Sequence, residues 1–144
     1  MDILVYAGLF LPEQNPELPN VLTEKAESGA RVRILFGDPD SPHVAERGRE
    51  EGIGDAIRHK IRNVMVHYRG LEPVSGIEVR VHRTNLYNSV YRFDNDMLIN
   101  LHVYGLAAAH APMMHLRRLA EARLFTTYYQ SFERVWAESA PAWT

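Results

Sequence analysis

Two neighbouring stretches of this sequence carry polar side chains at alternate positions. The polar side chains are Tyr87, Ser89 and Tyr91 in the first stretch and Asn100, His102 and Tyr104 in the second. Both stretches are rich in aromatic and β-branched residues, and Asp94 to Asp96 between them favour a tight turn. Side chains alternate between the two faces of a strand, so each polar set shares one face. The pattern predicts a hairpin, Leu86–Phe93 and Met97–Tyr104, whose polar face lines a pocket for a small polar ligand.

The opposite face of the second strand is wholly apolar and is predicted to be core. It carries Met97, Ile99, Leu101 and Val103. A register slip of one residue turns these side chains into the pocket and buries the polar set, at a cost of about 1–3 kcal/mol for each unpaired polar group. We therefore expect this alternation to fix which side of the hairpin faces water. We also expect His102 and at least one tyrosine hydroxyl to line a cavity that solvent reaches.

The first forty residues predict a parallel pair of strands. Ile3–Phe10 is an apolar run typical of a buried strand, and Leu18–Ser28 has helical spacing before the next strand, Arg31–Phe36. Strand, helix and strand in this order are typical of a right-handed βαβ unit. Asp38 and Ser41 follow the second strand at its carboxyl end, where open α/β sheets bind ligands. Capping of the next helix explains these two residues equally well, and both interpretations stay open.

The remaining periodicity predicts a helix-flanked sheet. Further helices are expected over 41–51, 53–68 and Leu124–Glu138, and further strands over Ile77–His82 and Met113–Leu119, the last at a sheet edge. The second of these helices carries Arg62, a further candidate ligand contact. An aromatic stripe on the last helix indicates packing in the core or in a dimer. The expected fold is α/β, with a mixed, largely parallel sheet flanked by helices.

Composition limits the classes of function. A length of 144 residues favours one domain, residues 1–144, and a net charge of -2 gives no reason to expect nucleic-acid binding by this chain alone. The absence of cysteine excludes disulfides and thiolate chemistry. No apolar run reaches the roughly 18 residues of a membrane helix, and MDILVYAG does not resemble a signal peptide. We expect a cytoplasmic protein with no membrane partner, and a further domain before Met1 in nature.

Histidines cluster near the second strand of the hairpin, but their spacing does not predict a metal site. His102, His110 and His115 lie in a short stretch near Asp94 and Asp96. Their separation fits no usual set of metal ligands. We therefore expect neither a metal nor a cofactor.

Four phrases of the sequence resemble a known kind of domain. GLFLPEQNP, RVRILFGDPDSP, GREEGIGDAIRHKIRN and LYNSVYRFDNDMLIN resemble the C-terminal domain of some bacterial helix-turn-helix (XRE-type) transcription regulators. That domain belongs to the phospholipase D-like superfamily. The resemblance implies a phospholipase D-like half-domain, and contact with DNA only through a separate N-terminal helix-turn-helix domain. Since active phospholipase D enzymes set two such halves face to face, it also implies a homodimer that buries at least about 1,200 Å² in total.

The sequence departs from the superfamily at its reactive residues. Active members carry His-x-Lys-x4-Asp, in which the His attacks phosphorus and the Lys binds the phosphate. If Asp94 takes the Asp place, Tyr87 stands in the His place and Ser89 in the Lys place. A tyrosine with a pKa of about 10 and no Lys helper is a poor nucleophile.

We therefore expect no catalytic residue and no hydrolysis of phosphodiesters. The expected function is a ligand-sensing or dimerisation domain of a transcription regulator. The first alternative is a phosphodiesterase of the phospholipase D type with a changed nucleophile, which would lose turnover when Tyr87 or His102 is replaced. The second is a purely structural dimer module with a vestigial pocket.

Overall fold

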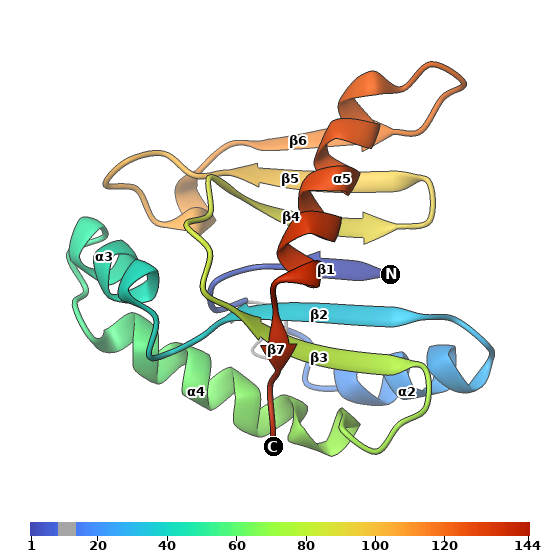
Figure 1. The fold of residues 1–144 in the computed structure, drawn as a ribbon, viewed down its shortest axis with the longest axis horizontal. Helices are drawn as coiled ribbons and strands as arrows, with labels where there is room; N and C mark the ends of the chain where they lie inside the picture. Colours follow the sequence, from blue (N-terminus) through green and yellow to red (C-terminus); the bar gives the residue numbers. More distant parts are fainter. Residues whose placement is uncertain (9–13) are drawn as a thin grey trace.

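A computed structural model of the chain describes residues 1–8 and 14–144, and its strands form one seven-stranded sheet (Figure 1). The strands are β1 Asp2–Leu4, β2 Val32–Gly37, β3 Ile77–His82, β4 Asn88–Phe93, β5 Asp96–Leu101, β6 Met113–Arg117 and β7 Ala140–Pro141. Their order across the sheet is β6-β5-β4-β1-β2-β3-β7. The α/β class is confirmed. The first strand is shorter than the predicted Ile3–Phe10, of which residues 9 and 10 lie outside the described residues.

The prediction of a largely parallel sheet is wrong. Only β1–β2 and β2–β3 are parallel, and the other four strand pairs are antiparallel. Parallel neighbours need a crossover, which is supplied here by α2 Leu18–Glu27 and then by α3 Pro42–Glu50 with α4 Ala56–Tyr68. After β3 the chain has short connections. Successive strands β4, β5 and β6 therefore pair antiparallel, and they make up one side of the sheet.

The helices cover both faces of the sheet (Figure 1). On one face Tyr68 of α4 packs edge-on against Phe36 of β2, with 5.5 Å between ring centroids. On the other face α5, Arg123–Ala137, crosses the strands and places Phe132 over Arg33 of β2. Two short 3-10 turns, η1 Arg69–Leu71 and η2 Ala108–His110, complete the described helical elements. The predicted helix bounds agree with these to within a few residues.

The aromatic stripe of α5 belongs to the core. Phe125, Phe132 and Trp136 are buried, and Phe132 stacks on Trp136 with 6.0 Å between ring centroids. Met97 and Ile99 are fully buried, as their alternation predicts. Burial of these large side chains is the main force that holds α5 on the sheet, because each contributes roughly 1.5–3 kcal/mol.

A buried ionic network also fixes α5. Asp2 accepts two hydrogen bonds from Arg33, at 2.8 and 3.0 Å, and a third from Arg92 at 2.6 Å. Arg33 in turn donates to Glu133 of α5 at 2.6 and 3.2 Å. The guanidinium of Arg33 also lies 4.7 Å from the centre of the Phe132 ring. Strands β1, β2 and β4 are thus joined to α5 through a network whose centre, Asp2 and Arg33, is almost wholly out of water.

Candidate functional site

Four polar side chains lie together where β1, β2 and β3 end. We call His82, Tyr6, His102 and Ser89 the polar row. The Tyr6 ring lies between the two imidazoles, with its centroid 5.8 Å from that of His82 and 5.8 Å from that of His102. The carboxyl ends of parallel strands are the usual binding edge of an open α/β sheet. Here β4 begins and β5 ends at the same edge, so the hairpin brings its own polar residues to it.

His82 is held as a neutral imidazole. Its Nε2 donates to the Val5 carbonyl at 2.9 Å, and its Nδ1 accepts from the Thr84 amide at 3.2 Å. A ring that donates at one nitrogen and accepts at the other is neutral, because a second proton would replace the acceptor with a donor that faces the Thr84 N–H. Burial lowers the pKa of His82 to about 4. The residue therefore joins β3 to the end of β1 as a structural part of the row.

His102 forms a hydrogen-bonded pair with Ser89. The Ser89 hydroxyl lies 3.1 Å from Nε2 of His102, and Nδ1 of His102 lies 3.3 Å from the Leu86 carbonyl. The amide of Leu86 donates to the Tyr6 hydroxyl at 2.8 Å. Burial, with a smaller effect from the positive charge of Arg47, lowers the pKa of His102 to about 4. A neutral imidazole that accepts from a serine hydroxyl is the arrangement of an activated nucleophile, but Ser89 is buried and a backbone carbonyl orients the ring.

Arg47 ties the 102–112 loop to α3 beside the row. Its side chain is only 6% exposed and forms ion pairs with Glu50 at 3.2 Å and Glu51 at 2.7 Å. A third bond runs from the guanidinium to the Leu106 carbonyl at 3.0 Å. Asn100 holds the same loop by donating to the Ala108 carbonyl at 3.1 Å. The charge of Arg47 is therefore already neutralised, and the loop covers the polar side of the hairpin.

The predicted register of the hairpin is confirmed. Ser89 pairs with Asn100 and Tyr91 with Leu98, so the two polar sets share one face. The expectation that this face is wet is wrong for Ser89, Tyr91 and Asn100, which are buried. The reason is that helices and the 102–112 loop cover this face, while α5 covers the other.

The ends of the hairpin are more open than its middle. The Tyr87 side chain is 77% exposed and that of Tyr104 is 81% exposed, while His102 is half-buried. The prediction that Val103 is core is wrong, because β5 ends at Leu101 and Val103 is 42% exposed. Tyr87 and His102 are neighbours across the strands, since the His102 amide donates to the Tyr87 carbonyl at 2.9 Å. Tyr87 and His102 thus form an accessible part of the predicted ligand site, beside the exposed Tyr104.

Three other residues, Asp38, Ser41 and Arg62, are predicted to contact the ligand, and they follow β2 or lie on α4. Ser41 is the N-cap of α3, with its hydroxyl accepting from the His43 amide at 3.2 Å, so the capping interpretation is confirmed. Asp38 binds Arg83 at 2.7 Å, and Arg62 binds Asp40 at 3.0 Å. The Asp38 amide donates to the His82 carbonyl at 2.8 Å, which places Asp38 next to the row. Ligand contact by Asp38, Ser41 and Arg62 stays a prediction.

Sequence reasoning missed three residues of this site. Tyr6 lies in the middle of the apolar run Ile3–Phe10 and resembles core, Arg47 resembles part of a solvated helix face, and His82 is the last residue of a predicted strand. The carboxyl end of each parallel strand marks the binding edge, so this rule selects His82. It does not select Tyr6, because the strand that contains Tyr6 is predicted to run on to Phe10.

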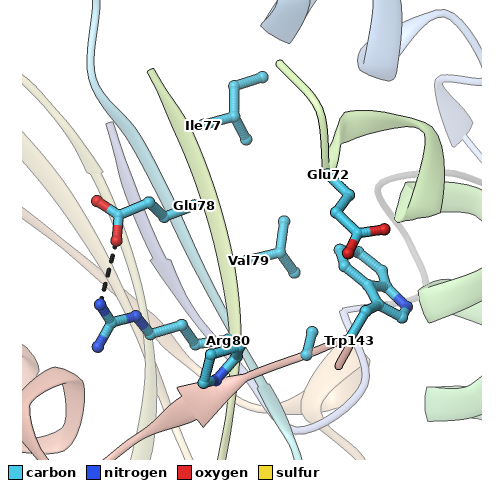
Figure 2. A pocket seen from close by; sticks show the side chains of 8 residues that line it. Glu72, Ile77, Glu78, Val79, Arg80 and Trp143 are labelled. Atoms are coloured by element: carbon cyan, nitrogen blue, oxygen red, sulfur yellow. Dashed lines mark hydrogen bonds and ion pairs between the residues drawn. The ribbon is translucent and has the colours of Figure 1, made fainter. Parts of the chain in front are cut away.

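Two shallow cavities lie away from the polar row. Figure 2 shows one of about 220 Å³ beside β3, with Ile77 and Val79 on one side and Glu72 and Trp143 on the other. The other, of about 500 Å³, lies between β6 and the start of α5. Within the described ranges, His, Asp and Glu side chains form no group of three that could hold a metal ion. The helices that the structure describes include none long and apolar enough to cross a membrane.

Comparison with known proteins places the chain in a family. No curated protein matches it. A solved structure, that of TrmBL2, an archaeal chromatin protein with "a novel mode of DNA binding", matches with 13% identity and a TM-score of 0.53. The match covers 98% of this chain and 45% of that one, so the likeness concerns the fold and less than half of that protein. Neither finding names a phospholipase D-like protein, and that resemblance stays a prediction. Residues 7–143 match the family described as a domain of unknown function, DUF5919, and the chain belongs to this family.

Proposed function

We propose that this chain is a non-catalytic regulatory domain of a DNA-associated protein, and that it binds a small polar ligand at the open end of the polar row. Support for DNA association comes from the fold, which is shared with part of a DNA-binding chromatin protein. Support for ligand binding comes from the row itself, where Tyr87 and His102 meet at an accessible edge. The observation that carries the non-catalytic part is the pairing of Arg47 with Glu50 and Glu51, which leaves its charge unavailable to a phosphoryl group.

The charges around the row favour a neutral ligand. Arg47 forms ion pairs with Glu50 and Glu51, and Arg49 is paired with Glu46. Two cations therefore face three carboxylates on α3 and its C-cap. An anionic phosphate would meet an excess of negative charge, whereas a neutral solute can use the hydroxyls, the imidazole and the exposed tyrosine ring.

The same charges weaken the phosphodiesterase alternative. Phosphoryl transfer needs positive charge placed against the equatorial oxygens. Ser89 stands where the superfamily has its phosphate-binding Lys. The nearby Arg47 already forms ion pairs with Glu50 and Glu51. Tyr87, in the place of the nucleophile, is 77% exposed.

Thermal unfolding tests ligand binding, and the release of p-nitrophenolate from the same samples tests hydrolysis. A panel of polyols, amides, amino acids and nucleosides provides neutral probes, and inorganic phosphate and bis(p-nitrophenyl) phosphate provide anionic ones. We expect a neutral probe to raise the melting temperature, by mass action on the folded state. His102→Gln should abolish that rise, and His67→Ala, at an exposed site on α4, should keep it. Release of p-nitrophenolate that Tyr87→Phe abolishes would establish the enzyme instead.

Direct DNA binding is tested separately. We expect this chain to leave the anisotropy of a fluorescent duplex unchanged at low salt, since its net charge is -2. Salt-sensitive binding by the chain alone would mean that the domain itself contacts DNA.

We also propose that the chain forms a homodimer. Light scattering that gives the mass of a monomer at tens of micromolar would contradict the homodimer.

A further inference from the structure

Strand β6 ends the sheet on one side, and no described strand pairs with its outer edge (Figure 1). The Pro112 carbonyl accepts from the Leu101 amide at 3.0 Å, and the Arg118 amide donates to the Asn95 carbonyl at 2.8 Å. Alternate residues of an antiparallel strand direct their backbone groups the same way, so the even-numbered residues of β6 bond to β5. Met113, His115 and Arg117 therefore direct their amides and carbonyls to the open side. Such a row is a template for an added strand.

The opposite edge of the sheet is protected. There β7 has only two residues, Ala140 and Pro141, and proline cannot donate to another strand. Short strands and proline are common ways in which proteins block edge pairing. In the described part of the chain, β6 is thus the edge at which pairing is unobstructed.

Basic side chains lie on and beside β6. His115 and Arg117 are exposed and share one carboxylate oxygen of Asp96, at 2.8 and 3.1 Å. Arg118 and Arg123 are exposed nearby, and no described residue forms an ion pair with either. Arg118 and Arg123 therefore carry positive charges that no described carboxylate pairs. This charge disfavours pairing of two β6 edges with each other and favours an acidic strand.

A largely apolar depression borders β6. Leu116, Leu119, Ala122, Leu124 and Phe125 line this cavity of about 500 Å³ at the start of α5, and the charged or polar residues His115, Arg117, Glu121 and Arg123 line it too. Leu119 is 70% exposed and Leu124 is 50% exposed, so the fold leaves apolar side chains in water there. A strand beside β6 would direct alternate side chains over this depression and the others toward Arg117.

We propose that the β6 edge docks an extended segment of a protein partner in which acidic and apolar residues alternate. The segment adds an eighth strand, bonds to the backbone of Met113, His115 and Arg117, and sets its carboxylates against the arginines. This mode is β-strand addition, in which backbone bonds give affinity and alternate side chains give specificity. No residue of the polar row takes part, so the proposal stands apart from ligand sensing.

Fluorescence anisotropy with two synthetic peptides tests the proposal. The acidic probe is an eight-residue peptide of alternating Glu and Val, and the comparison probe has Lys in place of Glu. We expect the acidic peptide to bind, with an affinity that falls as salt rises, and the basic peptide not to bind. Arg117→Glu should weaken binding by at least about tenfold, and Arg69→Glu, the same charge change at the distant η1 turn, should leave it unchanged.

A pair of substitutions at His115 tests the backbone bonds. His115→Pro removes an outward amide and leaves the β5–β6 bonds in place, so the fold should persist with a nearly unchanged melting temperature. Binding should be lost in His115→Pro and retained in His115→Ala. Equal binding by both peptides, or equal binding by the Pro and Ala variants, would overturn the proposal. Dissociation of a wild-type homodimer by His115→Pro would also overturn it, because a second copy would then occupy the edge.

Discussion

Replacing Asp2 with asparagine leaves the buried Arg33 and the half-buried Arg92 facing a neutral amide. Asp2 is 2% exposed and accepts three hydrogen bonds from Arg33 and Arg92. Removing one partner of a buried ion pair costs about 3–5 kcal/mol because the other charge stays desolvated. Glu133 still pairs with Arg33 in the variant. We therefore expect a loss near the lower end, about 3 kcal/mol in the free energy of unfolding.

Urea denaturation measures this loss. With a slope of about 1–3 kcal/mol per molar, a loss of about 3 kcal/mol moves the midpoint down by about 1 M or more. Asp96→Asn is the matched control, because Asp96 also binds two side chains, His115 and Arg117, but its own side chain is exposed to solvent. We expect no measurable shift for the control. If Asp2→Asn moved the midpoint no further than Asp96→Asn, the network would not be holding α5 as described.

The pH dependence gives a second check on Asp2. Burial raises its pKa, but hydrogen bonds from Arg33 and Arg92 outweigh this and hold the pKa below its usual value. A carboxyl with a lowered pKa in the folded state stabilises the fold above its unfolded pKa of about 3.9, and this contribution is lost below that value. The gap between the wild type and Asp2→Asn should therefore be constant above about pH 5 and close as the pH falls below about 4.

Three further changes have clear expected results. Tyr68→Phe should raise the free energy of unfolding by about 1 kcal/mol in urea, because the buried Tyr68 hydroxyl has no hydrogen-bond partner among the described residues. Trp136→Ala should cost about 3–5 kcal/mol in the same assay, because it removes a buried ring packed on Phe132 and Arg80. Since the pKa of His82 is about 4 in the folded state, stability should fall as the pH drops from about 6.5 toward 4, and His82→Gln should reduce that slope. Unchanged midpoints in the first two, or an unchanged slope in the third, would contradict the corresponding packing or protonation.

Local patterns in the sequence predicted the hairpin and the helices well. The Ser89–Asn100 pairing follows from strand alternation about the Asp94–Asp96 turn, where Asp94 adopts a positive φ of 54°. Helix ends follow from local signals such as Ser41 before Pro42. These features depend on residues close in sequence, and for that reason one sequence is enough to indicate them.

The strand order and the polar row depend on contacts between distant residues. The Val5–His82 bond joins residues 77 apart, and the Tyr6–Leu86 bond joins residues 80 apart. No periodicity within either strand marks these partners. The covering of the hairpin's polar face by the 102–112 loop depends likewise on Arg47 reaching Leu106, 59 residues away. For the same reason the sequence indicated which residues share a face but not which face is open.

The central proposal is that a neutral polar ligand binds at the open end of the polar row without being transformed. The most direct test is the NMR spectrum of the histidine rings, with the His102 signal assigned through His102→Gln. The probe is the neutral solute that raises the melting temperature most. We expect the His102 signal to shift until saturation, the His67 signal to stay fixed, and the solute's own spectrum to remain intact. An unmoved His102 signal at saturation, or conversion of the solute into a product, would contradict the central proposal.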